Sequence, residues 1–132
     1  MIFLLNDIKD HLKSLDYNYD VTVRPSNSKL TPTYPLITID EIDNSVKQSI
    51  NGVEKYSGVT YQIDIYSKDM YPSSALTVLK SLASTVSDEI QTYYGLLRQN
   101  MTIMPDVNDE TVTRMTMRFT GTLDPINEVI YK

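Results

Sequence analysis

The chain has 132 residues, no cysteine and a formal net charge of −5 at pH 7. This length suits one hydrophobic core, so we expect a single domain over residues 1–132. The absence of thiols excludes disulfides and thiolate chemistry, and scattered lysines and arginines on an acidic chain argue against binding to the nucleic-acid backbone. No segment has the length and apolar character of a membrane span, and the apolar start lacks the basic flank of a signal sequence, so we expect a soluble protein.

The first quarter of the chain predicts a helix, a short strand and a loop. Val21 and Val23 alternate in a predicted strand over residues 19–24, and residues 25–35, with three prolines, are predicted to form a loop. At the start of the chain, ahead of this strand and loop, apolar residues recur at steps of three or four, which is typical of an amphipathic helix of about four turns. These residues are Ile2, Leu5, Ile8, Leu12 and Leu15.

The middle of the chain predicts two strands with an ambiguous connection. Residues 36–42 are rich in β-branched side chains and predict a strand. Residues 43–57 are polar, have no sustained period and contain Asn51-Gly52, so they predict either a long hairpin loop or two frayed strand extensions around an Asn-Gly turn. Residues 59–66 form the clearest strand, with one face made of Val59, Tyr61, Ile63 and Ile65.

The second half predicts a long helix and a hairpin. Ser74 is a good N-cap, and Gly95 stands where a left-handed helix end is expected. A hairpin follows over residues 101–104 and 110–120, whereas residues 123–132 predict no element. The helix carries an apolar stripe made of Ala75, Leu79, Leu82, Ala83, Val86, Ile90, Tyr93 and Leu97. The hairpin's second arm has one face made of Thr113, Met115, Met117 and Phe119.

This order of elements predicts an α+β fold. We expect a mainly antiparallel β-sheet that is covered on one face by the N-terminal helix and the longer central helix. Four methionines gather in the last hairpin, where they either fill gaps under the sheet or form an adaptable contact surface. They are Met101, Met104, Met115 and Met117.

Residues that could perform chemistry are scarce. His11 is the only histidine, and its place in the first helix predicts a surface or flanking position. Asp40, Glu41 and Asp43 form the densest acidic cluster, but they lack the glycine and the alternating oxygen ligands of a calcium loop, so a solvated strand end is the better interpretation. We therefore expect that the protein is not an enzyme and that it has no catalytic residue, no cofactor and no metal site.

Two arginines are expected on the outer face of the last strand. Arg114 and Arg118 share that face, where they could pair with Asp64 on the outer face of a neighbouring strand. Such a cross-strand pair contributes from a few tenths up to about 1 kcal/mol, so it helps the register more than the stability.

Several short motifs together carry a family resemblance. Residues 34–39 read Tyr-Pro-Leu-Ile-Thr-Ile, residues 61–68 read Tyr-Gln-Ile-Asp-Ile-Tyr-Ser-Lys, and residues 117–119 read Met-Arg-Phe. With its N-terminal helix, long helix and final hairpin, the chain resembles the small tail-terminator (tail-completion) proteins of long-tailed bacteriophages and phage-like particles. The resemblance covers nearly the whole length and departs in residues 25–35 and in the tail after Gly121.

The resemblance implies a structural virion protein and a set of partners. It implies a subunit of a closed ring, commonly a hexamer, that caps the head-proximal end of the tail tube, stops its polymerisation and presents the head-joining surface. The implied partners are other copies of the chain, the tail tube protein and the head–tail connector protein, with assembly in the host bacterial cytoplasm. DNA would pass through the lumen without specific binding, and no membrane is involved.

Three segments are expected to make the contacts: residues 25–35, 43–57 and 123–132, because loops order on contact and strand edges pair with incoming backbone. The candidate contact residues are Leu30, Tyr34, Asp43, Asn51, Gly52, Tyr56 and Tyr131. If Asp40, Glu41 or Asp43 line the lumen, their charge would repel passing DNA.

Two alternatives stay open. Head–tail connector or neck subunits of similar size share much of the pattern, and the sequence separates them poorly from a tail terminator. A small non-viral α+β domain that binds a ligand or regulates another protein is the alternative from a different class.

Overall fold

A computed structural model of the chain describes residues 5–15, 17, 21–25, 33–50, 53–69, 74–105, 112–124 and 129–131. In chain order the elements are α1 (Leu5–Ser14), β1 (Thr22–Arg24), β2 (Leu36–Ile50), β3 (Val53–Ser67), α2 (Ala75–Glu89), a π-helical turn η1 (Ile90–Tyr94), β4 (Leu97–Pro105), β5 (Thr113–Asp124) and β6 (Val129–Tyr131).

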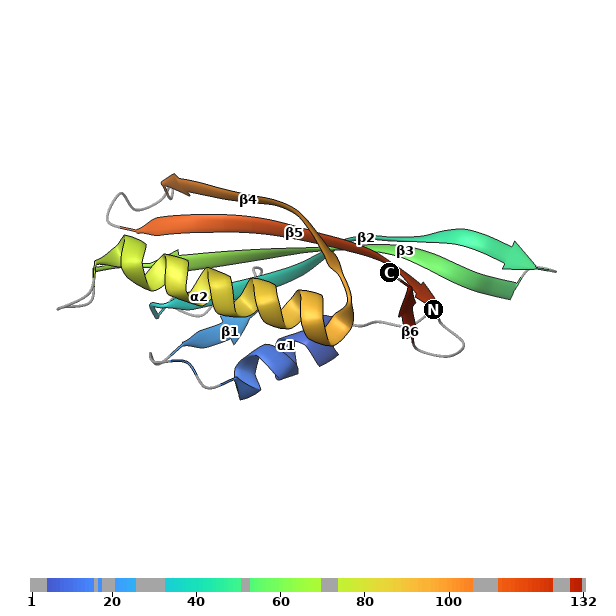
Figure 1. Ribbon diagram of the computed structural model, residues 1–132, viewed down its shortest axis with the longest axis horizontal. Helices are drawn as coiled ribbons and strands as arrows, with labels where there is room; N and C mark the ends of the chain where they lie inside the picture. Colours follow the sequence, from blue (N-terminus) through green and yellow to red (C-terminus); the bar gives the residue numbers. More distant parts are fainter. Residues whose placement is uncertain are drawn as a thin grey trace.

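The strands form one sheet in the order β1-β2-β3-β5-β4, and β6 pairs with β5 (Figure 1). Every described pair is antiparallel except β1 with β2, which is parallel from Thr22 opposite Leu36. Both helices lie on the same face of the sheet (Figure 1). The predicted α+β fold, with a mainly antiparallel sheet and two helices, is therefore confirmed.

The core lies between the two helices and this face of the sheet. Ile8 and Leu12 of α1 are fully buried, and so are Tyr61, Ile63 and Ile65 of β3. Their spacing explains the arrangement, because steps of four on a helix and of two on a strand each place side chains on one face. Burial of one such large apolar side chain contributes about 1.5–3 kcal/mol, so these positions hold the helices on the sheet.

The long helical segment begins at Ser74 and ends at Gly95 as predicted, but its last turn differs from the prediction. Ser74 caps it, with its side chain accepting a hydrogen bond from the Thr77 N–H at 3.3 Å, and Gly95 ends η1 with a left-handed φ of 72°. The expected buried stripe through Tyr93 and Leu97 is wrong. The wider π-helical turn rotates the last residues, so that Tyr94 is buried, Tyr93 is 63% exposed and Leu97 already belongs to β4.

Residues 43–50 and 53–57 belong to strands, so their interpretation as a long loop is wrong. β2 and β3 pair from Leu36 opposite Tyr66 to Ile50 opposite Val53, so the alternative of two strand extensions is correct. Register shifts follow Glu41, Val46 and Gln48. Each irregularity interrupts the period of two, which explains why the sequence shows no alternation there.

The end of the chain also contains a strand that was not predicted. β5 runs on to Asp124, and β6 pairs with it from Thr122 opposite Tyr131. The sequence missed β6 because three residues are too short to show a period. At the other end of the chain, β1 covers Thr22–Arg24 of the strand expected over residues 19–24, of which residues 19 and 20 lie outside the described part.

Candidate assembly surfaces

The outer part of the β2–β3 hairpin projects beyond the helices and the other strands (Figure 1). We call residues 44–50 of β2 and 53–58 of β3 the arm. A strand of 15 residues is about 50 Å long at ~3.3 Å per residue, and the outer end of β2 lies beyond both helices (Figure 1). β5 pairs with β3 only as far as Ser57, so residues 53–56 have β2 as their one ladder partner among the described strands.

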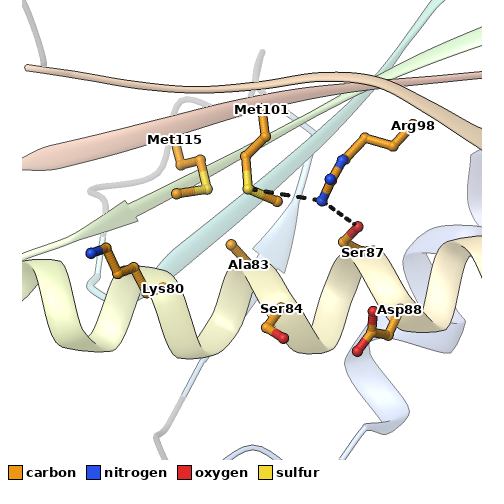
Figure 2. Close-up of a pocket in the computed structure, with 8 residues that line it drawn as sticks. All are labelled: Lys80, Ala83, Ser84, Ser87, Asp88, Arg98, Met101 and Met115. Atoms are coloured by element: carbon orange, nitrogen blue, oxygen red, sulfur yellow. Dashed lines mark hydrogen bonds between the residues drawn. The ribbon is translucent and has the colours of Figure 1, made fainter.

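A groove lies on the helix-bearing face between α2 and β4, with a volume of about 220 Å³ (Figure 2). Met101 of β4 and Met115 of β5 reach toward Ala83 of α2, while Lys80 and Arg98 stand at opposite ends. Ser84, Ser87 and Asp88 complete its lining.

Arg98 is held in place at its end of the groove. Its Nη1 donates to Ser87 Oγ at 3.1 Å and lies 3.9 Å from Met101 Sδ. Gln91 donates to the same Ser87 hydroxyl at 3.2 Å. The buried Ser87 therefore fixes a cation beside an apolar floor, in a groove whose Met101 is 36% exposed. The suggestion of an adaptable methionine surface fits Met101, whereas Met115 and Met117 fill the core.

The helix-free face carries a buried polar row across three strands. Thr38, Asp64 and Thr116 are opposite one another in the β2–β3 and β3–β5 registers. Arg114 Nη2 donates to Asp64 Oδ2 at 3.2 Å, and the Arg114 guanidinium lies 5.6 Å from the centre of the Tyr66 ring. Asp64 is 3% exposed, so the pair is far less solvated than expected for a strand face.

Arg118, the other arginine of the suggested pair, has a different partner. Its Nε donates to Gln62 Oε1 at 3.2 Å, and Gln62 in turn donates to Asp64 Oδ2 at 3.2 Å. Asp64 is opposite Thr116, so Arg114 and Arg118 both lie diagonally from it. Arg118 bonds to Gln62, the residue opposite it, and Arg114 is the arginine that reaches the carboxylate.

The three acidic lumen candidates do not form one surface. Asp40 is opposite Gln62, on the helix-free face, whereas Glu41 is opposite Tyr61 and accepts a hydrogen bond from its hydroxyl at 3.2 Å. Consecutive strand residues point to opposite faces, so Asp40 and Glu41 cannot line the same wall. The Cα of Asp43 is opposite Thr60, beyond the irregularity in β2.

The other contact candidates are spread over the molecule. Tyr34 precedes the cis peptide bond to Pro35, and Lys68 Nζ lies 4.9 Å from the centre of its ring. Tyr56 is opposite Gln48 in the arm, and Tyr131 lies in β6. Leu30, Asn51 and Gly52 lie outside the described residues.

The single histidine joins the two helices instead of facing solvent. His11 Nε2 lies 2.7 Å from Glu89 Oε1, and its ring stacks on Tyr93 with centroids 4.1 Å apart. Its side chain is 18% exposed. His11 therefore lies at the flank of the helix, as expected. The sequence could not identify its partner, because Glu89 is 78 residues away.

The hydroxyls of Tyr94 and Tyr17 both form hydrogen bonds with residues of α1. The Tyr94 hydroxyl donates to Asp7 Oδ2 at 2.9 Å and lies 3.1 Å from the Asp7 backbone oxygen, while that of Tyr17 donates to the Leu12 backbone oxygen at 2.8 Å. Burial, followed by the hydrogen bond to Asp7, raises the pKa of Tyr94 well above its usual value. Burial, followed by the charge of Glu89, raises the pKa of Tyr17 in the same direction.

Neither a metal site nor a membrane span emerges from the part of the chain that the structure describes. In it, no group of three or more histidine, aspartate or glutamate residues is placed to hold an ion. None of its helices combines the length and the apolar character that membrane crossing requires. Comparison of the sequence with known protein families and with curated proteins gives no match.

Proposed function

We propose that the chain is a structural virion protein, a phage tail terminator that forms a ring and caps the head-proximal end of the tail tube. In this function it is not an enzyme: it stops tube polymerisation and presents the surface to which the head is joined. Its partners are other copies of itself, commonly six in a ring, the tail tube protein and the head–tail connector protein. DNA passes through the lumen without specific binding, and the particle is assembled in the host bacterial cytoplasm.

The observation that carries the proposal is the β2–β3 arm. A two-stranded hairpin is only marginally stable in water on its own, because it buries little apolar surface. This arm extends past the sheet and has no third strand along residues 53–56 among the described elements. A neighbouring subunit that packs against the arm would offset the cost of ordering it.

An arm of this kind suits a subunit that must end a polymer. Tube rings add head to tail, so a terminator has to match the last ring on one side and offer a different surface on the other. The helix-covered body and the projecting hairpin are two such different surfaces on one chain (Figure 1).

The decisive experiment mixes the purified chain with its cognate tube protein and images the products by negative-stain electron microscopy. A terminator gives tubes of limited growth with one capped end. A connector or neck subunit leaves tube growth unchanged, and a monomeric chain that forms no rings and binds no tube favours a small ligand-binding domain.

A shortened arm makes this test specific. Replacing residues 47–56 with Asn-Gly leaves Val46 opposite Ser57 as the last pair and gives a turn that suits a two-residue hairpin. The core residues that the structure describes lie outside the removed segment, so we expect the variant to keep its circular dichroism spectrum. We expect it to lose capping, and capping at the wild-type level would contradict the role given to the arm.

A further inference from the structure

The sheet has two open edges among the described strands. β4 is the last strand on one side and pairs only with β5. On the other side, β1 pairs with β2 only from Leu36 to Thr38, so along residues 39–50 the side of β2 that faces away from β3 has no described strand. An open edge presents backbone N–H and C=O groups that can pair with another chain.

The two edges have the directions and lengths that antiparallel pairing between two copies requires. β2, β3, β5 and β4 alternate in direction, so β2 and β4 run opposite ways. A second copy placed beside the first, with its helices on the same face, therefore brings its β2 edge antiparallel to β4. The nine residues of β4 fit along residues 39–50 of β2.

The β2 edge carries an exposed apolar side chain. Ile42 lies at the irregularity between Glu41 and Asp43 and is 49% exposed. In the sequence it stands among three acidic residues, at positions 40, 41 and 43. It thus combines an apolar side chain of anchoring size with a local negative charge.

The β4 side carries the complementary features. The groove beside β4 has an apolar floor of Ala83, Met101 and Met115, with Lys80 and Arg98 at its ends (Figure 2). Asp88, the one acidic residue in its lining, points away from the floor in this view. A cavity of about 150 Å³ holds a benzene ring, so about 220 Å³ leaves room for an isoleucine side chain.

We propose that Ile42 of one copy inserts into the α2–β4 groove of the next copy, while β2 of the first pairs antiparallel with β4 of the second. The contact is head-to-tail, because each copy uses a different surface on its two sides, and such contacts generate rings when the rotation closes. The inference rests on the proposed function in one respect, which is that the chain assembles with itself.

Disulfide trapping tests the contact directly, because the chain has no cysteine of its own. The variants Ile42→Cys and Met101→Cys are purified separately, mixed and mildly oxidised. Cysteines join only when their Cα atoms approach within about 7 Å, so a covalent dimer reports this contact. We expect it in the mixture at several times the level of the matched control, Ile42→Cys mixed with Thr85→Cys, since Thr85 is exposed on α2 outside the groove.

A second pair of variants measures the anchor. We expect Ile42→Asp to raise the concentration needed for half-assembly at least about tenfold, because a charge replaces an apolar anchor, whereas Ile42→Val keeps most of the assembly. Circular dichroism checks that both variants are folded. Assembly of Ile42→Asp at the wild-type concentration would overturn the proposal.

The outcomes separate this contact from the proposed function. Rings of the unmodified chain without trapping above the Thr85→Cys control overturn the contact and leave the terminator proposal standing. Strong dimers of Met101→Cys alone indicate pairing of β4 with a second β4, which also overturns the contact. No self-assembly of the unmodified chain, alone or with tube protein, overturns both.

Discussion

Arg114 and Asp64 are joined diagonally across β5 and β3, with 3.2 Å between Nη2 and Oδ2. The second oxygen of this buried carboxylate, Oδ1, has no hydrogen-bond partner among the described residues, and neither do the hydroxyls of Thr38 and Thr116 beside it. One ion pair and the hydrogen bond from Gln62 therefore hold a polar row that is otherwise costly to bury.

This relationship predicts a large effect of removing the carboxylate. We expect Asp64→Ala to lower the free energy of unfolding by about 2–4 kcal/mol, because it leaves the Arg114 guanidinium partly buried without its partner. Urea unfolding followed by circular dichroism measures the loss. Arg118→Ala is the control, since Arg118 is exposed and, within the described part of the chain, its side chain bonds to Gln62; we expect this change to cost less than about 1 kcal/mol. Equal losses in the two variants would contradict the difference in burial.

The left-handed conformation of Gly95 predicts that substitutions at this position lower the stability by an amount that depends on the new residue. Its φ of 72° lies in the left-handed region, which costs other L-residues about 1–2 kcal/mol. We expect Gly95→Ala to reduce the free energy of unfolding by about that amount, and Gly95→Asn to reduce it less, because asparagine tolerates this conformation. Thermal unfolding of both variants provides the measurement. The interpretation fails if alanine is tolerated as well as asparagine.

The regular parts of this fold could be predicted from the sequence because they repeat. The alternation of Val59, Tyr61, Ile63 and Ile65 identifies the buried face of β3, and Ser74 and Gly95 mark the ends of the long helical segment. Each of these signals is local, so the residues carry it without any knowledge of the rest of the chain.

The irregular parts could not be predicted, because each breaks the period that reveals an element. The π-helical turn places Tyr94 in the core where the stripe predicted Tyr93, and the irregularities in β2 give its residues 43–50 the pattern of a polar loop. The groove was missed because Arg98, Ser87 and Met101 come together only in the fold. Ile42 did leave a signal, as an apolar residue among three acidic ones.

The contact of His11 in α1 with Glu89 in α2 predicts an energetic coupling between the two helices. We expect His11→Ala to cost about 1–2 kcal/mol, because it removes both the contact with Glu89 and the stacking on Tyr93. In a double-mutant cycle with Glu89→Gln, we expect a coupling energy above about 0.5 kcal/mol. Lys13→Ala, a change at an exposed position in the same helix, is the control, with little expected effect. If the losses of unfolding free energy at His11 and Glu89 are additive, the contact between the two side chains does not contribute to stability.

The last prediction concerns the raised pKa of Tyr94. An unfolded tyrosine loses its proton near pH 10, whereas the folded one holds it to higher pH, so the unfolded state binds fewer protons above pH 10. The stabilising contribution is therefore complete below about pH 10 and declines as the pH rises further, by at most about 1.4 kcal/mol per pH unit for this residue. We expect Tyr94→Phe to be less stable at neutral pH, since it loses the bond to Asp7, but to show a shallower decline above pH 10. Urea titrations at several pH values compare the two proteins, and equal slopes above pH 10 in the wild type and in Tyr94→Phe would contradict the assignment.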